Sequence, residues 1–404
     1  MEHTISTTAP ADDRLRTAIL TRGLRYVGTR GNLSSRVCIV GEAPGTEEDQ
    51  SRRPFVGYSG QEQDRMLSEA GFQPGHDCWY TNPYKVRPPD NKIERLGEHG
   101  IEKDLFEEQF FEELELNRPT IIITTGKTPT NLLCPETIPR KRGRKGEVDE
   151  KKEGFGKWRG SLLTSPKLSW PHWVIPIYHP AFVLRNWAER QVSVHIYGKA
   201  WEELSYYNTF GTIQPLPTRQ LYHSPSYDEI IQYLIECFQQ PDPLSIDIEL
   251  LFAVNKKLNL NIRYPSIFGI AKSPWDAMAF DMWGFEGDRQ NKVLRLMNTI
   301  LVHKRQIGQN YTTFDAHWLR AIGMRPRVNL VSDTLIRHHT LWPELPHSLA
   351  FMTMQYTREP YYKDTGKVWP LGANRAQIRK YCCRDCCVTY EVFNEQEKEF
   401  ALMN

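Results

Sequence analysis

The chain has 404 residues, of which 40% are hydrophobic and 25% are charged, a composition typical of globular domains with a buried core. Its 51 basic and 49 acidic side chains nearly cancel to a net charge of +2, so any nucleic-acid surface has to be local. No apolar run approaches the roughly 20 residues of a membrane span, and the first residues, MEHTISTTAPADD, lack the pattern of a signal peptide.

Short apolar runs that end in Gly or polar residues predict the strands of the first half. These runs are 37–41 (VCIVG), 78–82 (CWYTN), 121–126 (IIITTG) and 173–178 (WVIPIY), with a helical stretch near 61–70. Strands that alternate with helices are typical of an α/β sheet whose chemistry lies at the strand ends.

Distinct motifs follow these strands. GEAPGTEED covers 41–49, PFVGYSG covers 54–60, a TN…KVRPP segment covers 81–89 and YHPAFVLRN covers 178–186. Together, across about 35–190, they resemble the uracil-DNA glycosylase superfamily, most closely its iron–sulfur class. The resemblance implies an α/β/α sandwich that flips a base out of DNA and reads its Watson–Crick edge.

Residue roles follow from this resemblance. Phe55 is expected to stack on the base, Asn82 to hydrogen-bond its edge, and His179 to stabilise charge on the uracil oxygen. Glu48, with Glu42 as the less favoured alternative, is expected to stabilise the sugar cation and the attacking water. The segment 182–184 is expected to wedge into DNA beside Arg185, which meets a phosphate.

The iron–sulfur class carries four cysteine ligands that this chain lacks. The segment 21–33 contains no Cys, Val86 stands where another ligand is expected, and 105–116 contains none. We therefore predict that no iron–sulfur cluster is present, because such clusters are held by thiolates.

A charged, Gly-rich segment follows at 140–157, RKRGRKGEVDEKKEGFGK. One interpretation is a solvated loop. The other is a DNA-backbone contact through Lys141 and Arg142, because clustered cations suit phosphates. The two interpretations are compatible.

Gly and Pro interrupt the pattern at 208–218, so we predict two α/β domains, 1–210 and 211–404. In the second domain, the runs 244–249, 266–271 and 277–281 predict consecutive strands, and 288–302 predicts a helix.

Acidic residues mark three separate segments of the second domain. Asp247 and Glu249 are two apart on a predicted strand, so both carboxylates point to one face. Asp315 ends IGQNYTTFD, and Tyr381 and Asp385 are one helical turn apart. Four carboxylates of this kind are what a two-metal phosphodiesterase needs, since Mg²⁺ and Mn²⁺ prefer oxygen ligands.

The segment 381–390, YCCRDCCVTY, also holds half of the chain's eight cysteines. Adjacent cysteines cannot all be bridged, so we exclude a secreted disulfide framework and expect a reduced, cytoplasmic setting. No further Cys or His quartet completes a zinc site with Cys382, Cys383, Cys386 and Cys387. We therefore interpret these four as small buried apolar side chains.

The acidic segments, in this order, resemble the DEDDy branch of the DnaQ-like 3′→5′ exonucleases, which has a ribonuclease H-like α/β fold. Further similarity at 333–335, 345–357 and 361–363 points to the proofreading domain of phage-type family-A DNA polymerases. The resemblance implies that two Mg²⁺ or Mn²⁺ ions are held by Asp247, Glu249, Asp315 and Asp385, and that Tyr381 orients the attacking water.

The expected substrate is DNA with single-stranded or frayed 3′ ends, and the expected partner is a separate polymerase or a missing polymerase part. A phage-encoded protein of this kind works in the cytoplasm of its bacterial host. The alternatives are an exonuclease whose glycosylase-like half only binds DNA or docks a polymerase, and a non-enzymatic replisome subunit with both sites degenerate. The complete set of four acidic residues argues against the last of these for the second domain.

Overall fold

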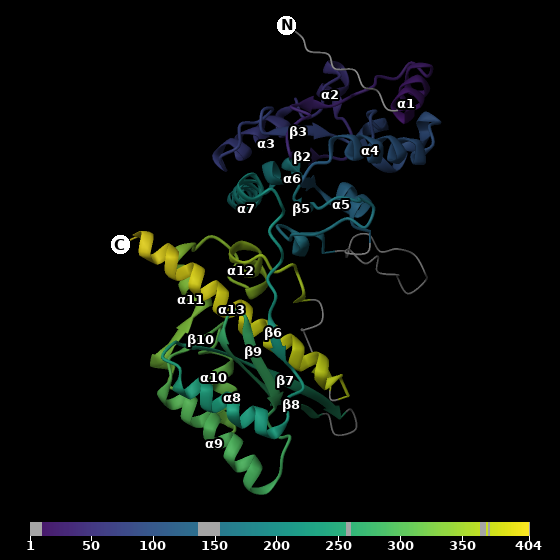
Figure 1. Cartoon of the computed structure of the whole chain (residues 1–404). Helices are drawn as coiled ribbons and strands as arrows, with labels where there is room; N and C mark the ends of the chain where they lie inside the picture. Colours follow the sequence, from purple (N-terminus) through teal and green to yellow (C-terminus); the bar gives the residue numbers. More distant parts are fainter. Residues whose placement is uncertain (1–9, 136–153, 256–259, 364–368, 371, 404) are drawn as a thin grey trace. The chain divides into compact units, whose positions relative to one another are not determined.

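The computed structural model describes residues 10–135, 154–255, 260–363, 369–370 and 372–403. The chain divides into two compact units, unit 1 (1–215) and unit 2 (216–404) (Figure 1). Lys141 and Arg142, the predicted DNA-backbone contacts, lie outside the described residues.

Unit 1 alternates strands with helices, as its sequence predicts. Its strands are β1 (Arg30–Gly31), β2 (Val37–Val40), β3 (Cys78–Thr81), β4 (Ile121–Thr125) and β5 (Trp173–Ile177). Its α-helices are α1 (Pro10–Leu20), α2 (Thr46–Ser51), α3 (Tyr58–Glu69), α4 (Lys103–Asn117), α5 (Lys127–Leu133), α6 (Pro180–Arg185) and α7 (Glu189–Phe210). Short 3₁₀ turns lie at Pro89–Asn91, Ile93–His99 and Phe155–Trp158.

The unit 1 sheet has the strand order β1–β3–β2–β4–β5, in which β3, β2, β4 and β5 are parallel and β1 is antiparallel. Every residue of β2 to β5 is buried, so both faces of the sheet are covered, as is usual for parallel sheets. Phe110 and Leu114 of α4 pack in one core cluster with Cys38, Val40 and strand residues of β4 and β5. This packing gives the α/β arrangement that the sequence predicts.

Unit 2 begins with its sheet and ends with a long helix. Its strands are β6 (Gln220–Tyr222), β7 (Leu244–Asn255), β8 (Leu260–Ser273), β9 (Asp276–Asp281), β10 (Gln306–Gly308), β11 (Val331–Asp333) and β12 (Trp369–Pro370). Its α-helices are α8 (Tyr227–Gln239), α9 (Gly287–His303), α10 (Asp315–Ala321), α11 (Thr334–Leu341), α12 (Leu349–Tyr356) and α13 (Arg375–Met403). One 3₁₀ turn spans Val328–Leu330.

The unit 2 sheet is mixed, with the order β11–β10–β7–β8–β9–β6 and with β12 beside β7. β7, β8 and β9 form an antiparallel meander, whereas β10 and β12 run parallel to β7. One face packs Ile246 and Ile248 against α8, α9 and α10, and the other packs Leu251 against the cysteines of α13. The alternation along β7 therefore turns Asp247 and Glu249 toward the α13 face.

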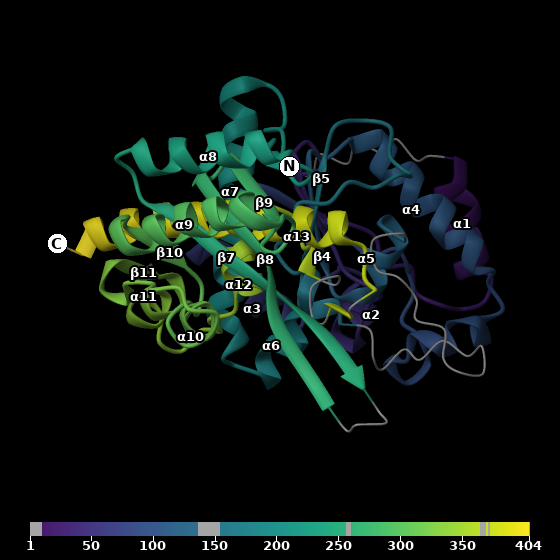
Figure 2. The same ribbon diagram turned by 90° about the horizontal axis from the view of Figure 1, so that it is seen from below.

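β7 and β8 are longer than the sequence predicts and extend beyond the rest of the sheet as a two-stranded arm (Figure 2). The pairing shifts register between Glu249 and Leu250 and continues to the pair Asn255 and Leu260. The outer parts of the arm pair with each other, so they do not need the alternation of apolar and polar residues that a strand on the core requires. The periodicity of the sequence therefore did not predict them as strands.

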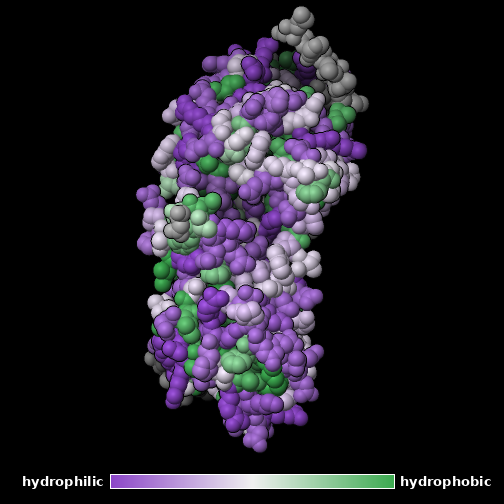
Figure 3. All heavy atoms as spheres, turned by 60° about the vertical axis from the view of Figure 1, so that its left-hand side comes forward, coloured by the Kyte–Doolittle hydropathy of each residue, from purple (hydrophilic) through white to green (hydrophobic). Residues whose placement is uncertain are grey.

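No helix in the described part of the chain is long and apolar enough to cross a membrane. On the face drawn in Figure 3, hydrophobic side chains lie in small separate groups among hydrophilic ones. Scattered groups of this kind are ordinary for a protein surface.

Candidate functional sites

The strand ends of unit 1 bring its predicted residues to one edge of the sheet. Gly41 and Glu42 follow β2, Asn82 follows β3, Gly126 follows β4, and His179 comes two residues after β5. Because these four strands are parallel neighbours, their carboxyl ends meet at the same edge.

Phe55 and Asn82 converge on the bare backbone of Gly41. A Cβ atom at Gly41 would lie 2.2 Å from the Asn82 Oδ1 atom and 2.7 Å from the Phe55 Cζ atom, so only glycine fits there. Phe55 itself has φ +57°, which is uncommon for an aromatic residue, and its ring is almost fully buried. The Asn82 side-chain amide has no hydrogen-bond partner within the described residues, so it is available to a ligand.

Glu48 is a structural brace in this site. Its Oε2 atom accepts a hydrogen bond from the Gly45 N–H (3.1 Å) and its Oε1 atom accepts one from the Gly57 N–H (2.8 Å). The carboxylate thus joins the start of α2 to the loop that carries Phe55. The alternative acid, Glu42, accepts a hydrogen bond from the Thr128 hydroxyl.

His179 is a neutral side chain at the start of α6. Burial lowers its pKa to about 4, with a further lowering by the charge of Arg185. The Nδ1 atom accepts a hydrogen bond from the Ala181 N–H (3.1 Å). The single proton of the neutral ring is therefore on Nε2, which becomes a hydrogen-bond donor.

The segment that follows His179 is only partly exposed. The Phe182 ring lies 4.4 Å from the Tyr178 ring, so it packs within the unit, whereas Arg185 is exposed at the end of α6. The structure thus leaves Arg185 free to meet a phosphate and places Phe182 against its own unit.

A buried polar cluster behind Phe55 was not marked by the sequence. The Tyr80 ring lies 5.5 Å from Phe55, and the Tyr80 hydroxyl donates to Asp64 (2.7 Å). Arg30 forms two hydrogen bonds to Asp64 and stacks 3.9 Å above the Tyr80 ring. This cluster fixes the aromatic surface on which Phe55 rests.

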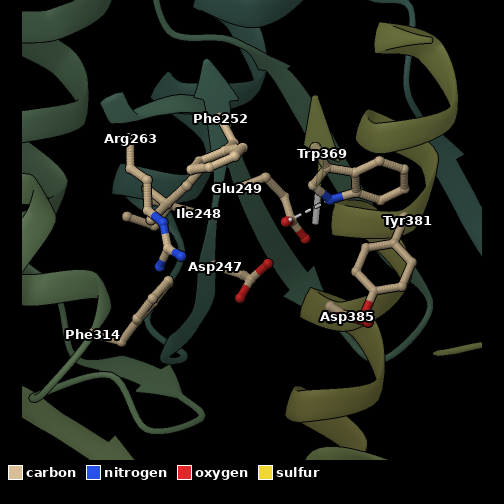
Figure 4. Close-up of a pocket in the computed structure, with 10 residues that line it drawn as sticks. Asp247, Ile248, Glu249, Phe252, Arg263, Phe314, Trp369, Tyr381 and Asp385 are labelled. Atoms are coloured by element: carbon tan, nitrogen blue, oxygen red, sulfur yellow. Dashed lines mark hydrogen bonds between the residues drawn. The ribbon is translucent and has the colours of Figure 1, made fainter. Parts of the chain in front are cut away.

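In unit 2, a cavity of about 310 Å³ opens between β7 and α13 (Figure 4). Acidic side chains line one part of it, and aromatic and basic side chains line another. The lining residues are Asp247, Ile248, Glu249, Leu250, Phe252, Arg263, Phe314, Trp369, Tyr381 and Asp385.

Asp247 and Glu249 point into this cavity from β7 (Figure 4). Burial and the neighbouring Asp385 raise the pKa of Asp247 to about 7, and burial and Asp247 raise the pKa of Glu249 well above its ordinary value. Trp369 Nε1 donates a hydrogen bond to Glu249 Oε2 (2.9 Å). Crowded, partly buried carboxyl groups of this kind are stabilised by a bound cation.

Asp385 is held by two side chains from the segment that precedes β12. The Tyr362 hydroxyl donates to its Oδ1 atom (2.7 Å), and Lys363 forms an ion pair with its Oδ2 atom. Tyr381, one turn before Asp385 on α13, has a pKa raised by burial and by Asp385, so its hydroxyl stays protonated.

Asp315 is buried next to β7 and does not line the cavity. Its Oδ1 atom accepts a hydrogen bond from the Ile248 N–H (3.0 Å), the residue between Asp247 and Glu249. Burial and the charge of Asp247 raise its pKa well above the ordinary value. The structure thus brings all four predicted carboxyl groups together, with Asp315 lying behind the other three.

Phe252, Arg263 and Phe314 line the cavity opposite α13, and the sequence did not mark them (Figure 4). The Arg263 guanidinium lies 5.5 Å from the centre of the Phe252 ring. Arg263 has no ion pair within the described residues, and 39% of Phe314 is exposed. The position of Arg263 beside Phe252 depends on the β7–β8 pairing, which no local pattern encodes.

Known proteins resemble parts of this chain. The family model of the uracil DNA glycosylase superfamily matches residues 29–205. A type-4 uracil-DNA glycosylase of Saccharolobus solfataricus is 33% identical over 175 residues, which are 43% of this chain and 74% of that protein. The chain belongs to the uracil-DNA glycosylase superfamily. The match covers the glycosylase-like unit 1.

Two other similarities are weaker. A DNA polymerase of Bacillus phage SP01 is 29% identical over 124 residues, which are 30% of this chain and only 13% of the polymerase. The solved structure of Brucella melitensis NrnC aligns with a TM-score of 0.30 and 15% identity, over 41% of this chain and 76% of that chain.

Val86 stands where the resemblance predicts a cluster ligand, and it lies in an apolar core of unit 1. Val86 packs with Leu15 and Ile19 of α1 and with Phe106 of α4 in one buried cluster. The unit's three cysteines lie elsewhere, on β2, on β3 and just after α5, and all are buried. These residues do not fit a cluster that needs four thiolate ligands.

Proposed function

We propose that unit 1 excises uracil from DNA and that unit 2 is a metal-dependent 3′→5′ exonuclease. The observation that carries the first activity is the convergence of Phe55, Asn82 and a neutral His179 at one sheet edge. The observation that carries the second is the convergence of four carboxyl groups from β7, α10 and α13.

Each residue of the unit 1 site has a distinct task in this proposal. A base flipped out of the duplex stacks on Phe55, and the free Asn82 amide pairs with its edge. The Nε2–H of His179 donates a hydrogen bond to the uracil oxygen as negative charge develops there. The neutral ring keeps its proton throughout. Glu48 contributes its negative charge near the sugar while its oxygens hold the two loops.

We propose that this unit works without an iron–sulfur cluster. The apolar packing around Val86 and Phe106 supports this proposal, because it can stabilise this part of the unit without a metal cluster. Purified protein is expected to contain no iron and to lack the broad visible absorbance of a cluster. About four irons per chain, as a [4Fe–4S] centre gives, would contradict this proposal.

The unit 2 site offers the oxygen-rich environment that Mg²⁺ or Mn²⁺ prefers. When bound, two such ions supply charge stabilisation for the attacking and leaving oxygens of the scissile phosphate. Asp247, Glu249 and Asp385 would hold them directly. Asp315 accepts a hydrogen bond from the Ile248 N–H and so fixes the β7 backbone between Asp247 and Glu249. Its carboxylate adds to the negative charge around the ions.

The remaining cavity residues suit the end of a DNA strand. Tyr381 keeps its proton and can orient the attacking water by hydrogen bonding. Phe252 and Phe314 offer aromatic surfaces for bases, and the guanidinium of Arg263 suits a phosphate. A cavity lined in this way favours single-stranded or frayed 3′ ends, because aromatic faces stack on unpaired bases.

A DNA polymerase is the proposed partner, as a separate polypeptide or as a part of a longer chain. The similarity to a phage DNA polymerase supports this proposal. The corresponding setting is the cytoplasm of a bacterial host. The second candidate is an exonuclease whose glycosylase-like unit binds uracil or docks the polymerase without excision, and the loss of the cluster ligands favours it.

One experiment tests both activities. The purified chain is incubated with a 5′-labelled oligonucleotide containing one uracil, in EDTA or in Mg²⁺, and then treated with alkali. Excision needs no metal and is expected to give one alkali-labile cut at the uracil, absent from a thymine control. Exonuclease action is expected to give a ladder from the 3′ end in Mg²⁺ alone. Uracil-dependent binding without a cut would support the second candidate.

A further inference from the structure

The thiol of Cys382 lies directly beside the carboxylates of unit 2. Cys382 is fully buried on α13, and its Sγ atom lies 3.4 Å from Asp247 Oδ2. On its other side is Gly269 of β8, where a Cβ atom would come within 2.4 Å of the sulfur. The sulfur is therefore held between the bare backbone of β8 and the acidic site.

Asp247, Glu249 and Cys382 are spaced as ligands of one metal ion. Each offers one ligand atom, and these atoms lie within 4.8 Å of one another. For a tetrahedral zinc ion with bonds of about 2.3 Å to sulfur and about 2.0–2.2 Å to oxygen, the two ligand atoms are roughly 3.5 Å apart. The observed spacing of 3.4 Å between the sulfur and Asp247 Oδ2 is close to this value.

Among the described residues, Cys382 is the cysteine whose sulfur is spaced with Asp247 and Glu249 for one metal ion. The Sγ atom of Cys383 faces the Tyr222 carbonyl oxygen at 3.7 Å, away from the carboxylates. Cys386 forms a hydrogen bond with Cys382, and its sulfur also lies beside Gly269, where a Cβ atom would come within 2.8 Å of it. Cys387 is buried in the core cluster between the sheet and α13. Cys382 also belongs to that cluster, so the interpretation as a buried apolar side chain holds for it only in part.

We propose that Cys382 makes this site a mixed oxygen–sulfur site that binds Zn²⁺ through Asp247, Glu249 and the Cys382 sulfur. The proposal deepens the proposed exonuclease function, on which it rests, because Zn²⁺ then competes with Mg²⁺ or Mn²⁺ for the same carboxylates. Thiolate sulfur selects soft ions such as Zn²⁺, whereas Mg²⁺ takes oxygen ligands. On binding, the hydrogen that the thiol donates to Asp247 is released to solvent.

Spectroscopy of the 404-residue chain tests the sulfur ligand without any measurement of activity. Cd²⁺ or Co²⁺ is titrated into metal-free protein, and the ultraviolet charge-transfer band of a sulfur–metal bond is recorded. We expect one such band in the wild type, its loss in Cys382→Ala, and its retention in Cys383→Ala, the matched buried cysteine that faces away. Asp247→Asn is expected to weaken the same band.

Affinity measurements give the second readout. Cys382→Ala and Cys382→Ser are expected to lower Zn²⁺ affinity by tenfold or more, roughly 1.4 kcal/mol, and to leave Mg²⁺ affinity unchanged. Circular dichroism melting confirms that each variant is folded. A missing band in the wild type, or an equal band or Zn²⁺ affinity in folded Cys382→Ala, overturns the proposal. A sulfur–metal band in a protein without exonuclease activity keeps the mixed site and overturns the proposed function instead.

Discussion

The two candidate sites of this chain have opposite electrostatics. The base-facing side chains of the unit 1 site are neutral, since burial lowers the pKa of His179 and the Asn82 amide carries no charge. The unit 2 site gathers carboxyl groups whose pKa values are raised because they are buried together. A neutral pocket suits an uncharged base, and an acidic cavity suits divalent cations. The electrostatics of the two sites therefore match the different substrates that we propose for them.

The two sites also differ in how the backbone supports them. In unit 1 the residues follow strand ends, and Phe55 adopts a left-handed conformation over Gly41. In unit 2, Asp247 and Glu249 lie within a strand, and Tyr381 and Asp385 lie within a long helix. Loops can shape a pocket around a flat base, whereas regular elements hold charged groups at fixed spacing.

The largest expected effect comes from removing the acidic pair on β7. Asp247→Ala combined with Glu249→Ala is expected to reduce metal-dependent degradation by roughly 10³-fold or more, because ion binding is lost. Release of labelled nucleotides from a single-stranded oligonucleotide in Mg²⁺ measures it. Uracil excision in EDTA serves as the control and is expected to stay unchanged. Undiminished degradation by the double variant would show that the site lies elsewhere.

The next largest effect is expected from removing His179 in the unit 1 site. His179→Ala is expected to slow uracil excision by about 10²–10³-fold, since one positioned donor to the developing oxyanion is lost. Formation of alkali-labile sites in EDTA measures the rate, and exonuclease activity in Mg²⁺ is the control. The wild-type rate should not fall as the pH drops from about 8 to 5, because the ring stays neutral until its pKa of about 4. Loss of excision near pH 6.5 would contradict the lowered pKa.

A smaller effect separates water orientation from ion binding in unit 2. Tyr381→Phe is expected to lower the exonuclease rate about tenfold, or 1.4 kcal/mol, because the ions stay bound while the water loses its hydrogen bond. Single-turnover rates at saturating Mg²⁺ measure this change. Tyr390→Phe, on the same helix outside the cavity, is the matched control. A loss as large as that of the acidic double variant would place Tyr381 among the residues needed for ion binding.

The smallest expected effect concerns metal-free stability. Since the pKa of Asp247 is raised to about 7, the folded protein keeps a proton that the unfolded chain releases near pH 4. The contribution of this proton to the free energy of unfolding is therefore fully present below about pH 4 and is lost as the pH rises through about 7. In EDTA, the melting temperature of unit 2 is expected to fall as the pH rises from about 4 to about 7. The fall is expected to be smaller in Asp247→Asn. A wild-type profile identical to that of the variant would exclude the raised pKa.

The sequence by itself determined the local directions on which both sites depend. The period of two along a strand placed Asp247 and Glu249 on one face, and the helical period placed Tyr381 one turn from Asp385. The ends of four apolar runs predicted where Asn82 and His179 would gather. These features are local, so the residues themselves encode them. Most of the predicted elements were found close to the predicted bounds, whereas β7 and β8 are longer.

Only the tertiary structure decided which side chains support those residues. It showed that Asp315 binds the Ile248 N–H instead of lining the cavity, and that Lys363 pairs with Asp385. It also showed that Glu48 braces two loops and that the Cys382 sulfur faces Asp247. Such contacts join segments far apart in the chain. They depend on strand register and helix packing, which no local pattern specifies.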